Sequence, residues 1–224
     1  MLNARNYMRG GARDDFDRSG LTALYGLIVV NILFFLLLPS ARHPELCLSM
    51  PGIRQGLSWE VVTALFMHAN FWHILFNMYS LYLFGGMIAP RLGAKRFLAL
   101  YFTAGIAGNL LWLASESFAG PAGLLLGASG AVMGVIAASA MMEPDVRLFI
   151  LFIPYPVKLR TMAMVFFGLD VFNEIFAGPA AGVAYLAHIG GFLVGAAFAA
   201  VFFKGFVRWN PFSFLTGGGR APRG

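Results

Sequence analysis

The sequence predicts an all-α membrane protein, a single bundle of six transmembrane helices with both termini in the cytoplasm. Three observations lead to this prediction. Hydrophobic residues make up 59% of the 224 residues and charged residues only 12%, whereas a soluble domain usually carries about 25% charged residues. The apolar residues are gathered in six long runs, and the basic residues lie between these runs. A surface so poor in charge could not stay in water, so we expect the bilayer to be the solvent.

Each predicted helix corresponds to one apolar run of roughly the 20 residues needed to cross a bilayer. In chain order the runs cover 21–38, 66–88, 97–114, 124–142, 161–177 and 183–203. A further run at 148–157 has only ten residues and contains Pro154 and Pro156, so we expect an interfacial connector there. The predicted domains are an N-terminal tail (1–20), the six-helix membrane domain (21–204) and a C-terminal tail (205–224).

The basic residues set the predicted orientation. Fourteen of the sixteen Lys and Arg residues lie before the first run, after the sixth run or in the links after the second and fourth runs. The other two are Arg42 and Arg54, in the loop after the first run. Loops rich in Lys and Arg stay in the cytoplasm, so both tails are expected there. These clusters form no basic stripe interleaved with aromatic residues, so the formal net charge of +6 does not indicate nucleic-acid binding.

Polar residues in three of the runs need an explanation, because an unpaired polar group in hydrocarbon costs several kcal/mol. They lie in the second, fourth and sixth runs: His68, His73 and Asn77; Gly127, Ser129 and Gly130; and His188, Gly191 and Gly195. Each set has an ordinary interpretation when it is taken alone. A Gly-x-Ser-Gly segment is more often a packing surface than a nucleophile, and a membrane histidine often bonds a neighbouring helix or lines an ion path.

The depth of these residues in the bilayer favours one common site. His73, Asn77, Ser129 and His188 stand fourteen to eighteen residues from the charge that ends their helix on the inner side, which is about 21 to 27 Å at 1.5 Å per residue. They therefore share one layer just below the outer surface of a hydrocarbon core about 30 Å thick. Independent packing residues would have no reason to share a depth.

This layer holds the groups of an acyl-transfer site. Ser129 is the candidate nucleophile, and His188 is the base that would take its proton. His73 and Asn77, together with backbone groups at Ser129 and Gly127, are candidates to stabilise the developing oxyanion. The sequence therefore predicts serine chemistry that needs no metal and no cofactor.

Two pairs of glycines would bring the fourth and sixth helices close together. Gly130 with Gly134, and Gly191 with Gly195, are both Gly-x-x-x-Gly pairs, which allow close backbone approach between membrane helices. Asp170, in the fifth run, stands about 15 Å above the inner charge of its helix at 1.5 Å per residue. That depth is too low for a third member of the site, so we expect a serine–histidine dyad.

Together the motifs resemble those of the rhomboid intramembrane serine proteases, of the bacterial six-span type, over nearly the whole chain. The resemblance rests on three segments, namely His68 with His73 and Asn77, Gly127-Ala-Ser129-Gly130, and Ala187-His188-x-x-Gly191-x-x-x-Gly195. It implies a rhomboid-like bundle that hydrolyses peptide bonds in or next to transmembrane segments. The expected partners are transmembrane protein substrates and membrane lipids. The expected location is a bacterial inner (plasma) membrane, with the active site opening to the outer side.

The resemblance also implies roles for residues around the dyad. His68 and Met133 would support the site, and the loop 39–65 would pack at the side of the bundle. The loop 178–182 would be a cap over the site, and substrates would enter between the second and fifth helices.

Three positions depart from the usual pattern of this family. Glu60 stands where an arginine is usual, Ala89 where a glutamate is usual, and Met133 where a tyrosine that stacks on the histidine is common. The arginine and the glutamate form an ion pair in the family, so we hypothesise a reversed pair here between Glu60 and Arg91.

Two other classes of protein remain compatible with the sequence. One is a non-proteolytic rhomboid-like binder of transmembrane segments, although such relatives typically lack the serine or the histidine. The other is a small transporter or channel that uses the buried histidines as a polar path, although the inner halves of the helices carry few ionisable groups to continue it.

Overall fold

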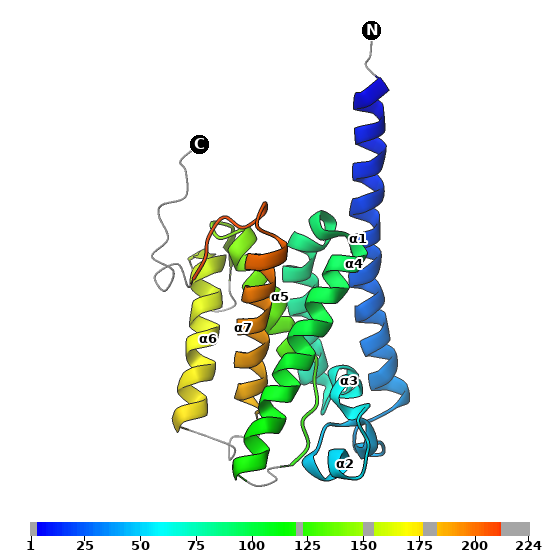
Figure 1. Ribbon diagram of the computed structural model, residues 1–224, viewed down its shortest axis with the longest axis vertical. Coiled ribbons are helices and arrows are strands. Elements are labelled where there is room, and N and C mark those ends of the chain that lie inside the picture. Colours follow the sequence, from blue (N-terminus) through cyan, green and yellow to red (C-terminus); the bar gives the residue numbers. More distant parts are fainter. Residues whose placement is uncertain (1–3, 120–122, 150–154, 177–182, 212–224) are drawn as a thin grey trace.

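The computed structural model describes residues 4–119, 123–149, 155–176 and 183–211. It is a bundle of long helices with a cluster of short helices at one end (Figure 1). The long helices are α1 (Ala4–Leu37), α4 (Phe71–Ala119), α5 (Ser129–Met142), α6 (Leu159–Phe176) and α7 (Tyr185–Phe202). The short elements between α1 and α4 are η1 (Pro44–Leu46), α2 (Met50–Arg54), α3 (Glu60–Thr63) and η2 (Ala64–Phe66).

Helix α4 combines two of the predicted helices. Its backbone reverses direction at Gly93, which has φ 72° and ψ 168°, a left-handed conformation that glycine adopts without the steric penalty of a side chain. The two arms of α4 therefore run antiparallel, side by side (Figure 1). The first arm begins at Phe71 and not at residue 66, because residues 64–66 form the separate 3₁₀ turn η2.

Three of the described helices are long and apolar enough to cross a membrane: residues 18–37, 71–117 and 185–202. The second of these contains both arms of α4, and α5 is apolar but only 14 residues long. At 1.5 Å per residue α5 extends about 21 Å, less than the hydrocarbon thickness of about 30 Å. The described part of the chain is thus mostly helical, and α1, the two arms of α4, α5, α6 and α7 each overlap one of the predicted runs.

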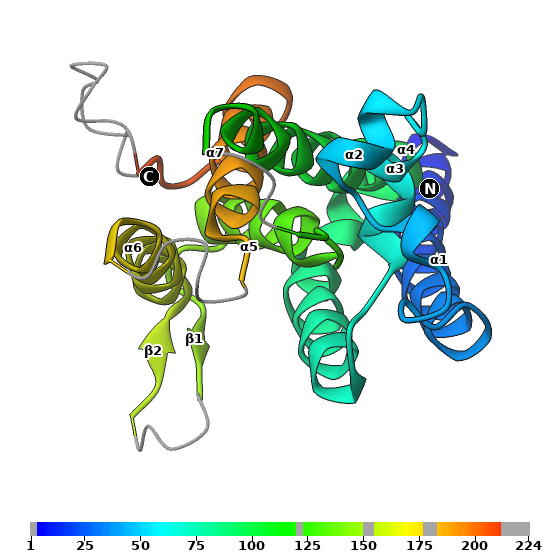
Figure 2. The same cartoon turned by 90° about the horizontal axis from the view of Figure 1, so that it is seen from below.

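Helix α5 is the centre of the bundle. Every residue from Gly130 to Met142 is buried, and the view along the bundle shows α5 surrounded by α4, α6 and α7 (Figure 2). The buried polar side chain of Ser139 on α5 has a hydrogen-bond partner in this core, because its hydroxyl donates to the carbonyl oxygen of Phe84 at 3.0 Å. The start of α1 and the end of α7 lie at the same end of the bundle (Figure 1).

The connector at 148–157 is not a helix in its described part. Strands β1 (Arg147–Leu148) and β2 (Val157–Lys158) pair antiparallel, with Arg147 opposite Lys158, and project beside α6 (Figure 2). Pro154 and the other residues of 150–154 lie outside the described residues.

The hypothesised ion pair between Glu60 and Arg91 is wrong. The Glu60 side chain is 1% exposed, and its carboxylate accepts hydrogen bonds from the Ser49 backbone N–H at 2.9 Å and the Ser49 hydroxyl at 3.3 Å. Arg91 instead pairs with Glu143, which also faces Arg208 at 3.7 Å. Glu60 therefore stabilises the first loop through hydrogen bonds to Ser49 within that loop. The ion pair of Arg91 with Glu143 instead connects the end of the first arm of α4 with the end of α5.

Candidate active site

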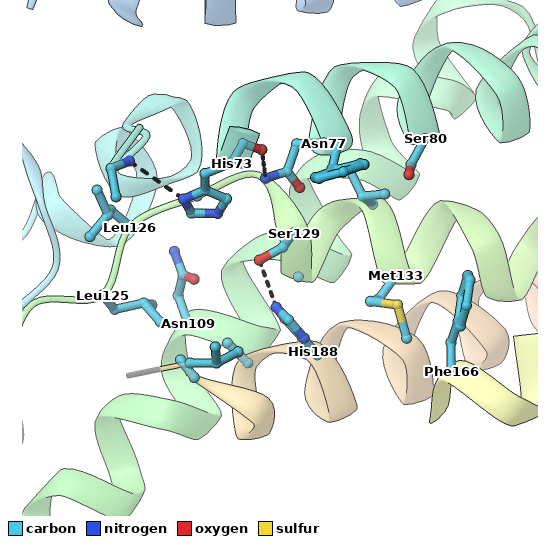
Figure 3. A pocket seen from close by; sticks show the side chains of 18 of the residues that line it. His73, Asn77, Ser80, Asn109, Leu125, Leu126, Ser129, Met133, Phe166 and His188 are labelled. Atoms are coloured by element: carbon cyan, nitrogen blue, oxygen red, sulfur yellow. Dashed lines mark hydrogen bonds between the residues drawn. The ribbon is translucent and has the colours of Figure 1, made fainter. Parts of the chain in front are cut away.

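Ser129 and His188 meet across the contact between α5 and α7. The Ser129 hydroxyl lies 2.8 Å from Nε2 of His188 (Figure 3), the distance of a normal O–H···N hydrogen bond. Ser129 is the first residue of α5 and His188 the fourth residue of α7. The start of α5 is fixed by the segment before it, because Leu125 pairs with Leu48 and the Gly127 N–H donates to the Ala64 carbonyl at 2.8 Å.

The predicted glycine pairs lie in the contact between these two helices. A Cβ atom at Gly191 would lie 2.7 Å from the carbonyl carbon of Gly130, and one at Gly195 would lie 2.7 Å from the carbonyl carbon of Gly134. Both distances are too short for a real contact between carbon atoms, which is about 3.5–4.0 Å. The backbones of α5 and α7 therefore approach as closely as they do because these positions carry no side chain.

His188 also contacts Asp170, a residue that the sequence led us to place outside the site. Nδ1 of His188 lies 3.2 Å from Oδ1 of Asp170, and the two side chains are only 18% and 13% exposed. The depth estimate failed because it counted each helix from its own inner charge, and such counts do not tell how far α6 (Leu159–Phe176) is shifted along its axis relative to α7 (Tyr185–Phe202). The signal in the sequence was the presence of an acidic residue within an apolar run.

His73 faces Ser129 from the other side of the site, on the first arm of α4 (Figure 3). Its Nδ1 accepts a hydrogen bond from the Ala69 backbone N–H at 3.4 Å, so Nε2 carries the ring proton. Nε2 is directed at Gly127, where an added Cβ would lie 2.7 Å from it. Gly127 also has φ 127°, so both its backbone conformation and the space beside His73 require glycine.

Asn77 lies one helical turn beyond His73 and lines the same cavity. Its Nδ2 donates to the carbonyl oxygen of His73 at 2.9 Å, which uses one of its two N–H bonds. The second N–H is not used by that bond, so Asn77 can still donate to a bound group.

His68 supports His73 from the loop before α4. The two imidazoles meet edge to face, with ring centroids 5.1 Å apart, and Nδ1 of His68 donates to the Phe66 carbonyl at 3.2 Å. Burial, with the neighbouring His73, lowers the pKa of His68 to about 4, so its ring is neutral near pH 7. Nε2 of His68 is buried without a hydrogen-bond partner among the described residues.

The site opens into a cavity of about 510 Å³ inside the bundle. Met133 and Phe166 form part of its apolar wall (Figure 3). An aromatic ring does lie beside His188, but it belongs to Tyr185 and not to position 133. The Tyr185 ring meets the imidazole edge to face, with ring centroids 6.4 Å apart. The polar lining consists of Asn70, His73, Asn77, Ser80, Asn109, Ser129 and His188.

The predicted cap at 178–182 lies outside the described residues. Within the ranges that the structure describes, no group of three or more His, Cys, Asp or Glu side chains could hold a metal ion.

A serine hydroxyl within hydrogen-bond distance of an imidazole, at the wall of a cavity, is an arrangement found in serine hydrolases. Here the arrangement lies in a bundle whose helices include three long and apolar enough to cross a membrane, among the described residues. The rhomboid domain model matches residues 55–205, which is more than half of the chain and includes the dyad. This chain therefore belongs to the rhomboid family, which includes the intramembrane serine proteases that its motifs resemble.

Curated relatives agree with this assignment. The chain is 36% identical over 148 residues to rhomboid protein 1, mitochondrial, of Saccharomyces cerevisiae, an alignment that covers 61% of this chain and 39% of that protein. It is 31% identical over 187 residues to the human presenilin-associated rhomboid-like protein, mitochondrial, covering 79% of this chain and 47% of that protein. The chain thus spans less than half the length of these relatives.

The expected bacterial inner (plasma) membrane is wrong. The yeast and human relatives are named as mitochondrial proteins, and the same holds for the mouse relative, which is 31% identical over 187 residues. The expectation rested on motifs of the active site, and these motifs carry no information on the membrane in which the protein lies.

Proposed function

We propose that this chain is an intramembrane serine endopeptidase, which hydrolyses peptide bonds in or next to transmembrane segments of membrane proteins. The observation that carries the proposal is the 2.8 Å contact between the Ser129 hydroxyl and Nε2 of His188 at the wall of a cavity inside the bundle. A packing serine would have no need of a base at hydrogen-bond distance. Mitochondrial relatives in the same family support a location in a mitochondrial membrane.

The reaction proceeds by acyl transfer in two halves. Oγ of Ser129 attacks the carbonyl carbon of the substrate while its proton passes to Nε2 of His188. The imidazolium then gives that proton to the leaving amine nitrogen as the C–N bond breaks, which leaves an acyl ester on Ser129. Water attacks the ester with His188 again as base, and the proton returns to Oγ as the acid product leaves.

The tetrahedral states place a negative charge on the former carbonyl oxygen, and three groups surround the space beside Ser129. His73 can donate from Nε2, Asn77 can donate its second amide N–H, and the backbone N–H of Ser129 is among the first four of α5, which have no partner within the helix. Gly127 keeps this space open, because a side chain there would collide with the ring of His73.

The proposed topology has six membrane crossings, with α1, the two arms of α4, α5, α6 and α7 each crossing once. Both termini and the basic links then face the same side, and the dyad lies toward the opposite side. The partners are transmembrane segments of substrate proteins and the surrounding lipids. Large apolar side chains exposed along α4 and α6, including Phe76 at 63% and Phe172 at 56%, suit contact with both.

The test is cleavage of a protein with one transmembrane segment, reconstituted in lipid vesicles with the purified enzyme. Ser129→Ala, His188→Ala and the double variant should be equally inactive, because residues that act as a unit do not lose activity additively. A serine-directed phosphonate should label the wild type at Ser129 alone, and the control Ser117→Ala, which removes an exposed hydroxyl on α4, should be labelled and active.

Cleavage that persists in Ser129→Ala would refute the proposal. A wild type that binds transmembrane segments without cutting them, and that resists the phosphonate, would instead identify the non-proteolytic binder.

A further inference from the structure

We propose that Asp170 is a positioning residue for His188, so that the site is a serine–histidine–aspartate triad built from three separate helices. The proposal rests on the proposed protease function and deepens it. Its basis is one chain of contacts, in which the Ser129 hydroxyl lies 2.8 Å from Nε2 of His188 and Oδ1 of Asp170 lies 3.2 Å from Nδ1 of the same ring. Each member comes from a different helix, α5, α7 and α6 respectively.

The contact with Asp170 selects the reactive form of the imidazole. An ionised carboxylate has no proton to donate, so the ring must donate to it from Nδ1–H. A neutral ring with its proton on Nδ1 has a lone pair on Nε2, the nitrogen that faces Ser129. Asp170 therefore holds the tautomer and the ring orientation that the removal of the hydroxyl proton requires.

The surroundings make the same carboxylate a counter-ion during the reaction. When His188 takes the proton from Ser129 it becomes a cation in a bundle where its side chain is 18% exposed, and an unpaired charge there would be costly. Oδ1 of Asp170 lies 3.2 Å from Nδ1 of this ring, so an ionised carboxylate there would offset the new positive charge. No Lys or Arg pairs with Asp170 in the part of the chain that the structure describes, so the attraction is directed at the imidazolium.

A purely structural role makes a different prediction. If Asp170 only fastened α6 to α7, an asparagine would serve nearly as well, because its amide oxygen can accept the same hydrogen bond. Asparagine lacks the negative charge, and its amide N–H can turn toward the ring and favour the wrong tautomer. Asp170→Asn therefore separates positioning from packing.

The experiment compares Asp170→Asn and Asp170→Glu with the wild type in lipid vesicles. It measures kcat and KM for a substrate with one transmembrane segment, the melting temperature and the rate of phosphonate labelling at Ser129. Asp170→Asn should lower kcat, by up to about 10⁴-fold as in the soluble triads, and should slow labelling. KM and melting temperature should stay at the wild-type values, because neither substrate contacts nor packing change.

Two further variants complete the design. Asp170→Glu retains the charge and should recover part of kcat. Glu174→Gln removes a charge from the same helix one turn away and should retain wild-type kcat, since Glu174 is not part of the site. If Asp170→Asn fails to fold, the Asp170→Glu result decides, with partial activity supporting the proposal and loss as complete as in Ser129→Ala overturning it.

The outcomes distinguish this inference from the proposed function. Wild-type kcat in Asp170→Asn, or a fall in kcat that Glu174→Gln shares, would overturn the role of Asp170 and leave the serine protease intact. Activity in Ser129→Ala would overturn the proposed function itself, whatever the Asp170 variants do.

Discussion

Replacement of Gly191 by alanine should move His188 away from Ser129 while both of these reactive side chains stay chemically unchanged. Gly191 lies three residues after His188 on α7, and it faces Gly130, the residue after Ser129 on α5. The added Cβ would lie 2.7 Å from the carbonyl carbon and 3.0 Å from Cα of Gly130. Both are backbone atoms that cannot rotate away, and carbon atoms need about 3.5–4.0 Å. Helix α7 must therefore move away from α5 by about 1 Å.

The consequence for the dyad follows from its present distance. A shift of about 1 Å would lengthen the 2.8 Å contact between Ser129 and His188 beyond the range of a hydrogen bond. A misplacement of that size can cost about 10²-fold in rate, and overpacking a well-filled interior usually costs about 1–3 kcal/mol of stability. We expect Gly191→Ala to lose about two orders of magnitude in kcat and to melt at a lower temperature.

The matched control is Gly168→Ala on α6. A Cβ there would meet no atom within 4 Å, and alanine is favoured over glycine inside a helix by roughly 1 kcal/mol. This variant should keep full turnover of a transmembrane substrate and melt no lower than the wild type. Equal turnover in Gly191→Ala and Gly168→Ala would show that close approach of α5 and α7 does not set the dyad distance.

Three further predictions follow from other parts of the molecule. Burial raises the pKa of the Cys47 thiol to about 11, so at pH 8 iodoacetamide should alkylate Cys47 only after denaturation, and rapid reaction of the folded protein would contradict its burial. Glu60→Ala should lower the free energy of unfolding by about 1–3 kcal/mol, because it leaves the Ser49 donors without an acceptor. In a double-mutant cycle its effect should add to that of Arg91→Ala, and a coupling between the two would contradict the absence of a Glu60–Arg91 pair. Asn77→Ala should reduce kcat by less than the roughly 10²–10³-fold typical of a single oxyanion donor, with KM unchanged; a loss of stability alone would remove Asn77 from the site.

The sequence alone predicted a mostly helical protein with membrane-spanning helices, and it selected Ser129 and His188, which the structure brings within hydrogen-bond distance. These features depend on local composition, because a run of apolar residues must satisfy its backbone hydrogen bonds within itself and so becomes a helix in a bilayer. A hydroxyl or an imidazole in such a run stands out because burying an unpaired polar group in hydrocarbon costs free energy. For this reason His73, Ser129 and His188 could be selected before their positions in space were known.

The tertiary structure decided which of these side chains meet. The contact of Asp170 with His188, the capture of the Glu60 carboxylate by Ser49 and the pairing of Arg91 with Glu143 all depend on how far one segment is shifted and rotated relative to another. Those offsets result from the summed packing of the whole bundle, in which close-packed helices have few alternative arrangements. No single residue encodes such an offset. Residue counts along separate helices therefore placed Asp170 too deep, and the analogy with the family's ion pair gave Glu60 the wrong partner.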